Sequence, residues 1–333
     1  MAASAKEPRI YLWDNLKFFL ITLVVMGHFA AAFTDSSENF RWLYICIYSV
    51  HMPLFIFISG LFSKSTVNNK SKLKKRVIFF IFCGFLSKMI NAVSLLLFQP
   101  KIIFSLLSDG AIPWFLFALA AFFMITSLTR NVKPSYVLIF AVLLAFFTGY
   151  DNTVRDYLYL SRIVVFFPFF YAGYLINPES LRKKVSGTGF RIASAVILVA
   201  FPVIIRAGLD VTYKLRPLLT GHNPYVNQTD GFLRLLCYAI SVITGLALIS
   251  LTPNIRIPFI TDAGKRTLQP YLLHHMFLRT FLIMPLFSRE LTVLPDIAFE
   301  AVFLILGVLV TFLLSANFFS FMIKWQDNLF DSD

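Results

Sequence analysis

The sequence predicts an all-α integral membrane protein, and three observations support this fold class. Hydrophobic residues make up 58% of the 333 residues and charged residues only 14%, whereas roughly a quarter of the residues in soluble domains are charged. Mean hydropathy is +0.75. The apolar residues gather in runs of about 20 residues, the length that a helix needs to cross a bilayer.

We expect about ten transmembrane helices within one polytopic domain that covers residues 1–333. The first run is interpreted as an uncleaved span rather than a signal peptide, because Asp14 and Lys17 lie where the apolar core of a signal would begin. The apolar runs cover residues 11–33, 42–63, 77–98, 112–128, 135–150, 160–176, 191–207, 232–251, 267–288 and 297–323.

The charges of the connecting loops predict the topology. One set of loops holds 18 Lys and Arg against 6 Asp and Glu, and the other holds 8 against 9. By the positive-inside rule the first set is cytoplasmic, so both termini are expected in the cytoplasm and the protein in the cell membrane. This topology explains the net charge of +13, which therefore does not indicate a nucleic-acid partner. The first set comprises residues 1–10, 64–76, 129–134, 177–191, 252–266 and 324–333.

The cysteines and histidines give no local metal signature. Cys46, Cys83 and Cys237 lie in apolar runs without CxxC spacing, which is typical of small buried hydrophobic residues. The sequence contains neither HxxxH nor HExxH. We therefore expect no metal cofactor.

Ionisable residues in a membrane span are rare and by default indicate a functional site. Three occur in the first span. Lys17 and His28 are eleven residues apart, so they share a helix face and are separated by a rise of about 16 Å. Asp14 precedes Lys17 by three residues and can pair with it. We interpret Lys17 as lying near the cytoplasmic entrance and His28 in the outer half of the membrane.

Two further spans carry polar groups. His51 lies about nine residues into the second span, which would place it at the depth of His28. Tyr271, His274 and His275 share one face of the ninth span. Each set has a structural alternative, in which the histidines bond backbone carbonyls, including those freed by Pro270. Other ionisable residues are expected to extend to the membrane interface. These are Lys88, Arg234, Arg279 and Glu300.

Several segments together resemble the membrane acyltransferase-3 family, most closely its fucose-4-O-acetylase-like branch. "YLWDNLKFFLITLVVMGHF" (11–29) resembles the opening helix of the family, although Lys17 stands where the family usually has Arg, and Lys cannot form a bidentate fork. "HMPLFIFISGLF" (51–62) and "KLKKRVIFF" (72–80) resemble the next two helices. "PWFLFAL" (113–119), "SRIVVFFPFFYAGYLI" (161–176) and "YLLHH" (271–275) are similar to later landmarks.

The resemblance implies O-acyl transfer from cytoplasmic acyl-CoA, expected to be acetyl-CoA, to a hydroxyl of an extracytoplasmic glycan or lipid-linked sugar. It makes His28 the catalytic imidazole, as base or transient acyl carrier, with Lys17 and Asp14 as partners. The outer loop 206–231, with His222, is expected to cover the acceptor. The basic cluster Lys72, Lys74, Lys75 and Arg76 is expected to bind the donor, and His51, Trp114, Arg162, Tyr271 and His274 the acceptor.

Two other classes of protein fit the same features. A proton-coupled transporter or flippase would also use His, Lys and Asp inside a bundle, although we find no repeat relating the two halves of the chain. A non-catalytic sensor or scaffold is the third class. The sequence is compatible with a homo-oligomer but does not identify an oligomeric state.

Overall fold

The computed structural model describes residues 9–98, 113–153, 157–283 and 296–320. Helices occur at every predicted run, and these parts of the chain contain no strand. The predicted run ends 284–288 and 321–323, the loop 99–111 and both chain termini lie outside the described residues. The long helices are α1 (Tyr11–Ala31), α2 (Glu38–Tyr48), α3 (His51–Leu61), α5 (Lys70–Phe98), α6 (Trp114–Leu128), α7 (Pro134–Thr148), α8 (Leu160–Leu175), α10 (Thr188–Ala207), α13 (Asp230–Leu251), α15 (Leu268–Ile283) and α16 (Asp296–Leu314).

Short helices and turns connect them. They are α4 (Lys64–Val67), α9 (Pro178–Val185), α11 (Leu209–Thr212), α12 (Arg216–Thr220), α14 (Ile260–Ala263) and the 3₁₀ turns Tyr157–Tyr159, Tyr213–Leu215 and Asn317–Ser320. Within the described residues, seven helical stretches are long and apolar enough to cross a membrane, while α6 and α7 are apolar but shorter. The protein is therefore a multi-pass membrane protein, and the count of ten spans remains a prediction.

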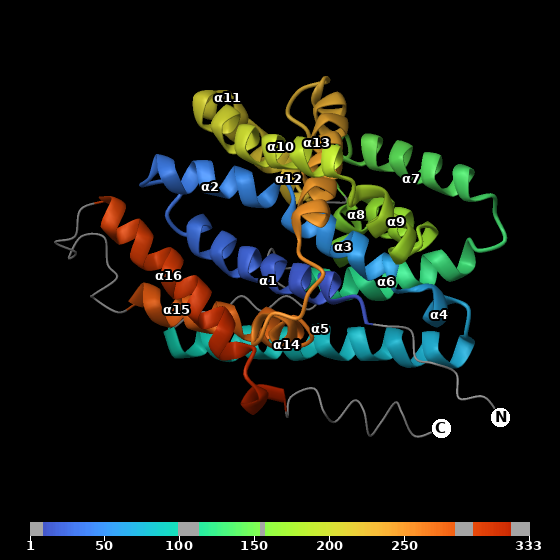
Figure 1. Ribbon diagram of the computed structural model, residues 1–333, viewed down its shortest axis with the longest axis horizontal. Coiled ribbons are helices and arrows are strands. Elements are labelled where there is room, and N and C mark those ends of the chain that lie inside the picture. The colour runs from blue at the N-terminus through green and yellow to red at the C-terminus, as the bar shows by residue number, and fades with distance from the viewer. Residues whose placement is uncertain (1–8, 99–112, 154–156, 284–295, 321–333) are drawn as a thin grey trace.

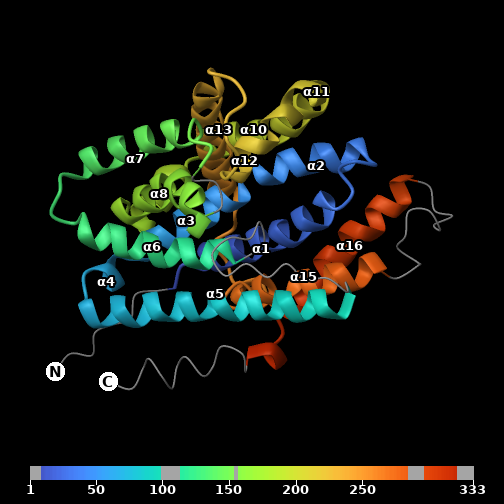
Figure 2. The ribbon, with the colours of Figure 1, turned by 180° about the vertical axis from the view of Figure 1, so that it is seen from behind.

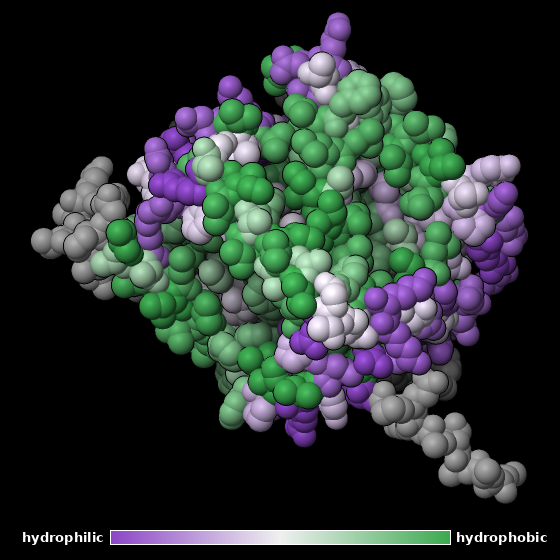
Figure 3. All heavy atoms as spheres, turned by 45° about the horizontal axis from the view of Figure 1, so that its top comes forward, coloured by the Kyte–Doolittle hydropathy of each residue, from purple (hydrophilic) through white to green (hydrophobic). Residues whose placement is uncertain are grey.

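The surface agrees with a bilayer as solvent. Val196, Val199 and Val203 on α10 are 62%, 67% and 62% exposed, which would be costly over a whole helix face in water but not in lipid. Figure 3 shows a broad hydrophobic surface with hydrophilic residues gathered around it.

The second predicted span is not one helix but two. The chain breaks between α2 and α3 at Ser49 and Val50. Backbone groups freed inside a membrane must find other partners, and here they do. Ser241 Oγ on α13 donates to the Ser49 carbonyl (2.5 Å), and His51 Nδ1–H donates to the Ile47 carbonyl (2.7 Å). Beyond the break, α3 continues from the end of α2 through the middle of the molecule (Figure 1).

Glycines let α3 and α8 pack backbone to backbone. A Cβ on Gly60 would lie 2.0 Å from the Phe170 carbonyl oxygen, and one on Gly173 would lie 2.1 Å from that of Phe57. Such approaches require small residues at the contact. On the opposite side of α1, α5 lies beside both α6 and α15 (Figure 2). Helices α1, α3, α5, α6, α8 and α15 thus enclose the centre of the molecule, where the polar residues gather.

Candidate active site

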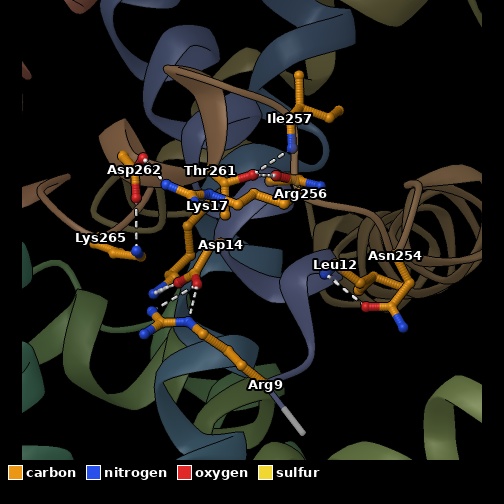
Figure 4. A network of polar contacts seen from close by, with 11 residues as sticks. Arg9, Leu12, Asp14, Lys17, Asn254, Arg256, Ile257, Thr261, Asp262 and Lys265 are labelled. Atoms are coloured by element: carbon orange, nitrogen blue, oxygen red, sulfur yellow. Dashed lines mark hydrogen bonds and ion pairs between the residues drawn. The ribbon is translucent and has the colours of Figure 1, made fainter.

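The first turns of α1 hold a buried carboxylate between two cations. Asp14 is 4% exposed. Its carboxylate pairs with Lys17 Nζ at 3.0 Å and with Arg9 Nη2 at 2.7 Å (Figure 4). The predicted pair of Asp14 and Lys17 therefore forms. Arg9, which the sequence did not single out for this contact, provides a second cation that offsets the cost of burying the carboxylate.

The segment between α13 and α15 is fixed to this end of α1 by Asn15, a residue that sequence reasoning missed. Asn15 Nδ2 donates to the carbonyls of Pro253 and Ile255, both at 2.9 Å. Its Oδ1 accepts a hydrogen bond from Thr261 Oγ1 at 2.7 Å. Gly264 follows in close contact, since its Cβ would lie 1.9 Å from the Asp14 carbonyl oxygen. These contacts carry Lys265 and Arg266 to the side of Lys17.

A cavity of about 400 Å³, called the Lys17 cavity, lies at this end of the bundle. Its lining contains the cations Lys17, Arg76, Lys265 and Arg266, and among its described residues no Asp or Glu. Lys265 also pairs with Asp262 at 2.6 Å. Hydrogen bonds from Lys265 and Arg256 lower the pKa of Asp262 to about 2, so this carboxylate is charged at neutral pH. Four cations against Asp14 and Asp262 leave the cavity positive.

Only one member of the predicted donor cluster lines this cavity. Arg76 does, with its guanidinium carbon 5.8 Å from the Phe80 ring centroid. Lys72, Lys74 and Lys75 lie one or more positions earlier on α5 and are not among its lining residues. Lys72 and Lys74 are exposed. Lys265 and Arg266 were missed, because they are contributed by a loop that the sequence indicated only as a topology signal.

A second cavity of about 740 Å³ lies further along α1 and is called the His28 cavity. His28 and His51 both line it, as the prediction of matched depth requires. The ring of Tyr48 contacts both imidazoles, with centroids 6.4 Å from His28 and 4.8 Å from His51. Because a carbonyl can only accept, the bond to Ile47 leaves the proton of neutral His51 on Nδ1. His51 therefore combines the structural alternative with a place in the cavity wall.

Trp114 and Arg162 form another part of this wall. The Arg162 guanidinium lies over the Trp114 ring, 5.2 Å from its centroid, and Arg162 Nη2 donates to His222 Nδ1 at 3.0 Å. Gly221 has a φ of 75° and its carbonyl accepts from Ser161 Oγ at 2.8 Å. This turn, which favours glycine, places His222 opposite Arg162.

The long loop 206–231 lines the His28 cavity; that this is the acceptor site stays a prediction. It contributes most of one wall, and Arg216 in this wall lies over the Tyr44 ring, 5.1 Å from its centroid. The loop residues that line the cavity are Arg216, Pro217, Leu219, Thr220, His222, Asn223, Pro224 and Val226.

The two cavities share three lining side chains. Val24 on α1, Met52 on α3 and Tyr271 on α15 line both of them. We call these three residues the neck. The predicted acceptor residue Tyr271 thus belongs to the junction rather than to the outer cavity alone.

The histidines of α15 lie next to His28. Ring centroids are 4.6 Å apart for His28 and His275 and 5.1 Å apart for His28 and His274. His275 lines the His28 cavity, whereas His274, the residue predicted for acceptor binding, is fully buried behind it. His274 Nδ1–H donates to the Pro270 carbonyl at 2.7 Å. The predicted face of α15 therefore lies at the site. Of its two histidines, however, His275 lines the cavity, and the prediction for acceptor binding named His274.

The expectation that four ionisable residues extend to the interface is wrong for two of them. Lys88 is 2% exposed, with Nζ 5.5 Å above the Tyr159 ring centroid. Arg234 is 1% exposed and donates to Tyr225 Oη at 2.6 Å and to the Leu218 carbonyl at 3.2 Å. Both charges stay inside because aromatic faces and oxygen acceptors there replace water.

The other two also have partners within the protein. Arg279 Nη1 donates to the Asn91 carbonyl at 3.0 Å. Glu300 accepts from the Ser37 hydroxyl and from Asn39 Nδ2, the latter at 2.8 Å. Glu300 therefore ties α16 to the N-terminal end of α2.

Fold and site together define a multi-pass membrane protein with a basic cavity and a histidine-lined cavity that share three lining residues. The chain belongs to the acyltransferase-3 family, because the acyltransferase domain of that family matches residues 10–316. It is accordingly a membrane acyltransferase. Comparison with curated proteins gives no match, nor does comparison with solved structures.

Proposed function

We propose that the protein is an O-acetyltransferase of the cell membrane. It moves an acetyl group from cytoplasmic acetyl-CoA to a hydroxyl of an extracytoplasmic glycan or glycolipid precursor, with both termini in the cytoplasm. The observation that carries this proposal is the neck. Val24, Met52 and Tyr271 line both cavities, and our proposal is that the donor held at Lys17 reaches His28 between these three side chains.

The Lys17 cavity suits the donor end of this reaction. The phosphates of CoA are multiply anionic, and Arg side chains bind such groups with two parallel hydrogen bonds. Arg76 and Arg266 supply guanidinium groups, and Lys17 and Lys265 supply point charges. The rise of about 16 Å from Lys17 to His28 is then crossed by the flexible pantetheine arm, which carries no charge and fits the apolar neck.

The His28 cavity suits the acceptor. Sugars present hydroxyls and apolar ring faces, which aromatic and amide side chains bind. Trp114, Tyr44 and Asn223 provide such groups beside His28. Arg162 and Arg216 in the same wall favour an acceptor that carries an anionic group, such as a lipid-linked sugar phosphate.

His28 performs the chemical step. No hydrogen bond occupies its imidazole nitrogens within the described part of the chain, so they are available to substrate. As a base, the imidazole takes the acceptor hydroxyl proton while the oxygen attacks the thioester carbonyl carbon. The C–S bond breaks and the thiolate takes the proton back. As an acyl carrier, the imidazole attacks first and releases the thiolate; the acceptor oxygen then takes the acetyl group from the imidazole, and the hydroxyl proton goes to the thiolate.

The test is transfer of label by purified protein. The protein is incubated with acetyl-CoA labelled in the acetyl group and with candidate glycans, and His28→Ala is compared with the parent and with His222→Ala, which removes another histidine of the same cavity. We expect transfer that falls by about 10²–10⁴-fold in His28→Ala, the range of general-base catalysis, and by much less in His222→Ala.

A proton-coupled carrier would also use two cavities that meet at a neck. It predicts movement of an acceptor across the membrane without any labelled product. Labelled product that persists in His28→Ala would contradict the role given to His28.

A further inference from the structure

Three histidines, one on α1 and two neighbours on α15, lie close together between these helices. One ring nitrogen of each of His28, His274 and His275 lies within 4.8 Å of those of the other two. The ring of His275 meets His28 edge to face, at 78°, and meets His274 at 86°. One nitrogen of each ring therefore borders the space between the three side chains. We call these three residues the histidine cluster.

The cluster holds buried nitrogens that lack a partner. His274 Nδ1–H is committed to the Pro270 carbonyl, which leaves the lone pair of the neutral ring on Nε2. That Nε2 atom is buried, and in the described residues it has no hydrogen-bond partner; the same is true of His275 Nε2. A buried polar atom without a partner costs about 1–3 kcal/mol. Two such atoms beside each other indicate a site for a bound group.

A transition-metal ion fits the chemistry of this donor set. Zinc binds neutral imidazole nitrogens at about 2.0–2.1 Å, which in tetrahedral geometry sets nitrogens about 3.3 Å apart. The nitrogens lie within 4.8 Å of one another, so the rings of His28 and His275 need to move inward by roughly 1.5 Å to hold the ion, while His274 keeps its bond to Pro270. The bond from His274 to Pro270 is the outer-shell contact that fixes the tautomer of a metal-binding histidine. His28 and His275 also line the His28 cavity, so the cluster borders that cavity.

We propose that the histidine cluster binds one zinc-like ion, and that this ion inhibits the enzyme. A lone pair of His28 that is bonded to a metal cannot take the acceptor proton or carry the acetyl group. The ion is thus an inhibitor rather than a cofactor, and all-imidazole ligation favours Zn²⁺, Cu²⁺ or Ni²⁺ over Mg²⁺ or Ca²⁺. Inhibition rests on the proposed function; binding of the ion does not.

Cobalt is the probe for binding. Purified full-length protein is stripped with a chelator and titrated with Co²⁺, and visible absorption reports tetrahedral nitrogen ligation. We expect one cobalt per chain, displaced by Zn²⁺. His275→Ala should weaken cobalt binding by at least the ten- to hundredfold that loss of an outer-shell partner costs. His222→Ala, outside the cluster, should keep the parent spectrum, and elution as a single species shows that each variant is folded.

Activity is measured in parallel. Zn²⁺ should abolish acetyl transfer by the parent, and a chelator should restore it. A parent that binds no cobalt, or a folded His275→Ala variant that binds it as tightly as the parent, overturns the site. Cobalt binding together with transfer that rises with Zn²⁺ overturns inhibition. Cobalt binding by a protein that transfers no acetyl group would leave the site standing and contradict the proposed function instead.

Discussion

The imidazole rings of His28 and His275 lie 4.6 Å apart although they come from opposite ends of the chain. Their contact depends on α1 packing directly against α15. The basic cavity at the start of α1 and the histidines near its end are consequently properties of one helix pair, and changes at either end should be separable by experiment.

Lys17→Met should weaken use of the donor more than use of the acceptor. The variant removes a cation from the Lys17 cavity but leaves Asp14 paired with Arg9, so folding should be retained. A hydrogen bond to a charged group contributes about 1.5–3 kcal/mol, which corresponds to a roughly ten- to hundredfold rise in KM for acetyl-CoA. Steady-state kinetics with each substrate varied in turn provide the measurement.

Lys72→Met is the matched control, since Lys72 is an exposed lysine of α5 outside the cavity lining. We expect a change in the donor KM of less than about twofold. An equal loss for donor and acceptor in Lys17→Met, or an effect of Lys72→Met as large as that of Lys17→Met, would contradict the donor role of the Lys17 cavity.

Gly264→Ala should destabilise the protein and disturb the same cavity. Its new Cβ would lie 1.9 Å from the Asp14 carbonyl oxygen, so backbone must move, and overpacking of this kind costs about 1–3 kcal/mol. Thermal unfolding in detergent measures the loss. Gly187→Ala is the control, because no atom lies within 4 Å of its Cβ position; equal unfolding temperatures for the two variants would disprove the close contact.

Val24→Trp should close the neck. Val24 is 2% exposed and lines both cavities, so a larger side chain there separates the donor from His28. We expect donor binding at the Lys17 cavity to persist while transfer falls by about a hundredfold, the scale of a misplaced reacting group. Val196 on α10 is 62% exposed, so the Val196→Trp variant is the control and should transfer acetyl groups at the parent rate. Undiminished transfer by folded Val24→Trp would show that the acetyl group takes another route.

The ion pairs of Asp262 should make the stability of the fold depend on pH in the acid range. Its pKa is lowered to about 2 by Lys265 and Arg256, against about 3.9 in an unfolded chain. Its contribution to stability is therefore complete above about pH 4 and is lost as the pH falls toward 2. Asp262→Asn should remove that part of the pH dependence of unfolding. An identical acid profile for parent and variant would contradict the pairing.

Patterns within a single helix could be predicted from the sequence. Spacing along α1 places Asp14 beside Lys17 and sets His28 on the same face, and helical periodicity is sufficient for that. The break between α2 and α3 was not predicted, because the run 42–63 is continuously apolar and the break depends on a hydroxyl from α13.

The features that the sequence did not predict depend on contacts between residues far apart in the chain. Asn15 is an ordinary polar residue until the loop after α13 docks on it. Arg234 is expected at an interface from its position in α13, yet Tyr225 and the Leu218 carbonyl keep it inside. Likewise the histidine cluster joins α1 to α15, and no local spacing indicates it.

A sided assay in proteoliposomes tests the central claim most directly, namely that one passage joins the Lys17 cavity to the His28 cavity. Acceptor is enclosed in the lumen, acetyl-labelled acetyl-CoA is added outside, and His28→Ala vesicles serve as control. We predict that label appears on the enclosed acceptor with the parent and not with His28→Ala, while CoA stays outside. Label that reaches the acceptor only when donor and acceptor share one side of the membrane would contradict it.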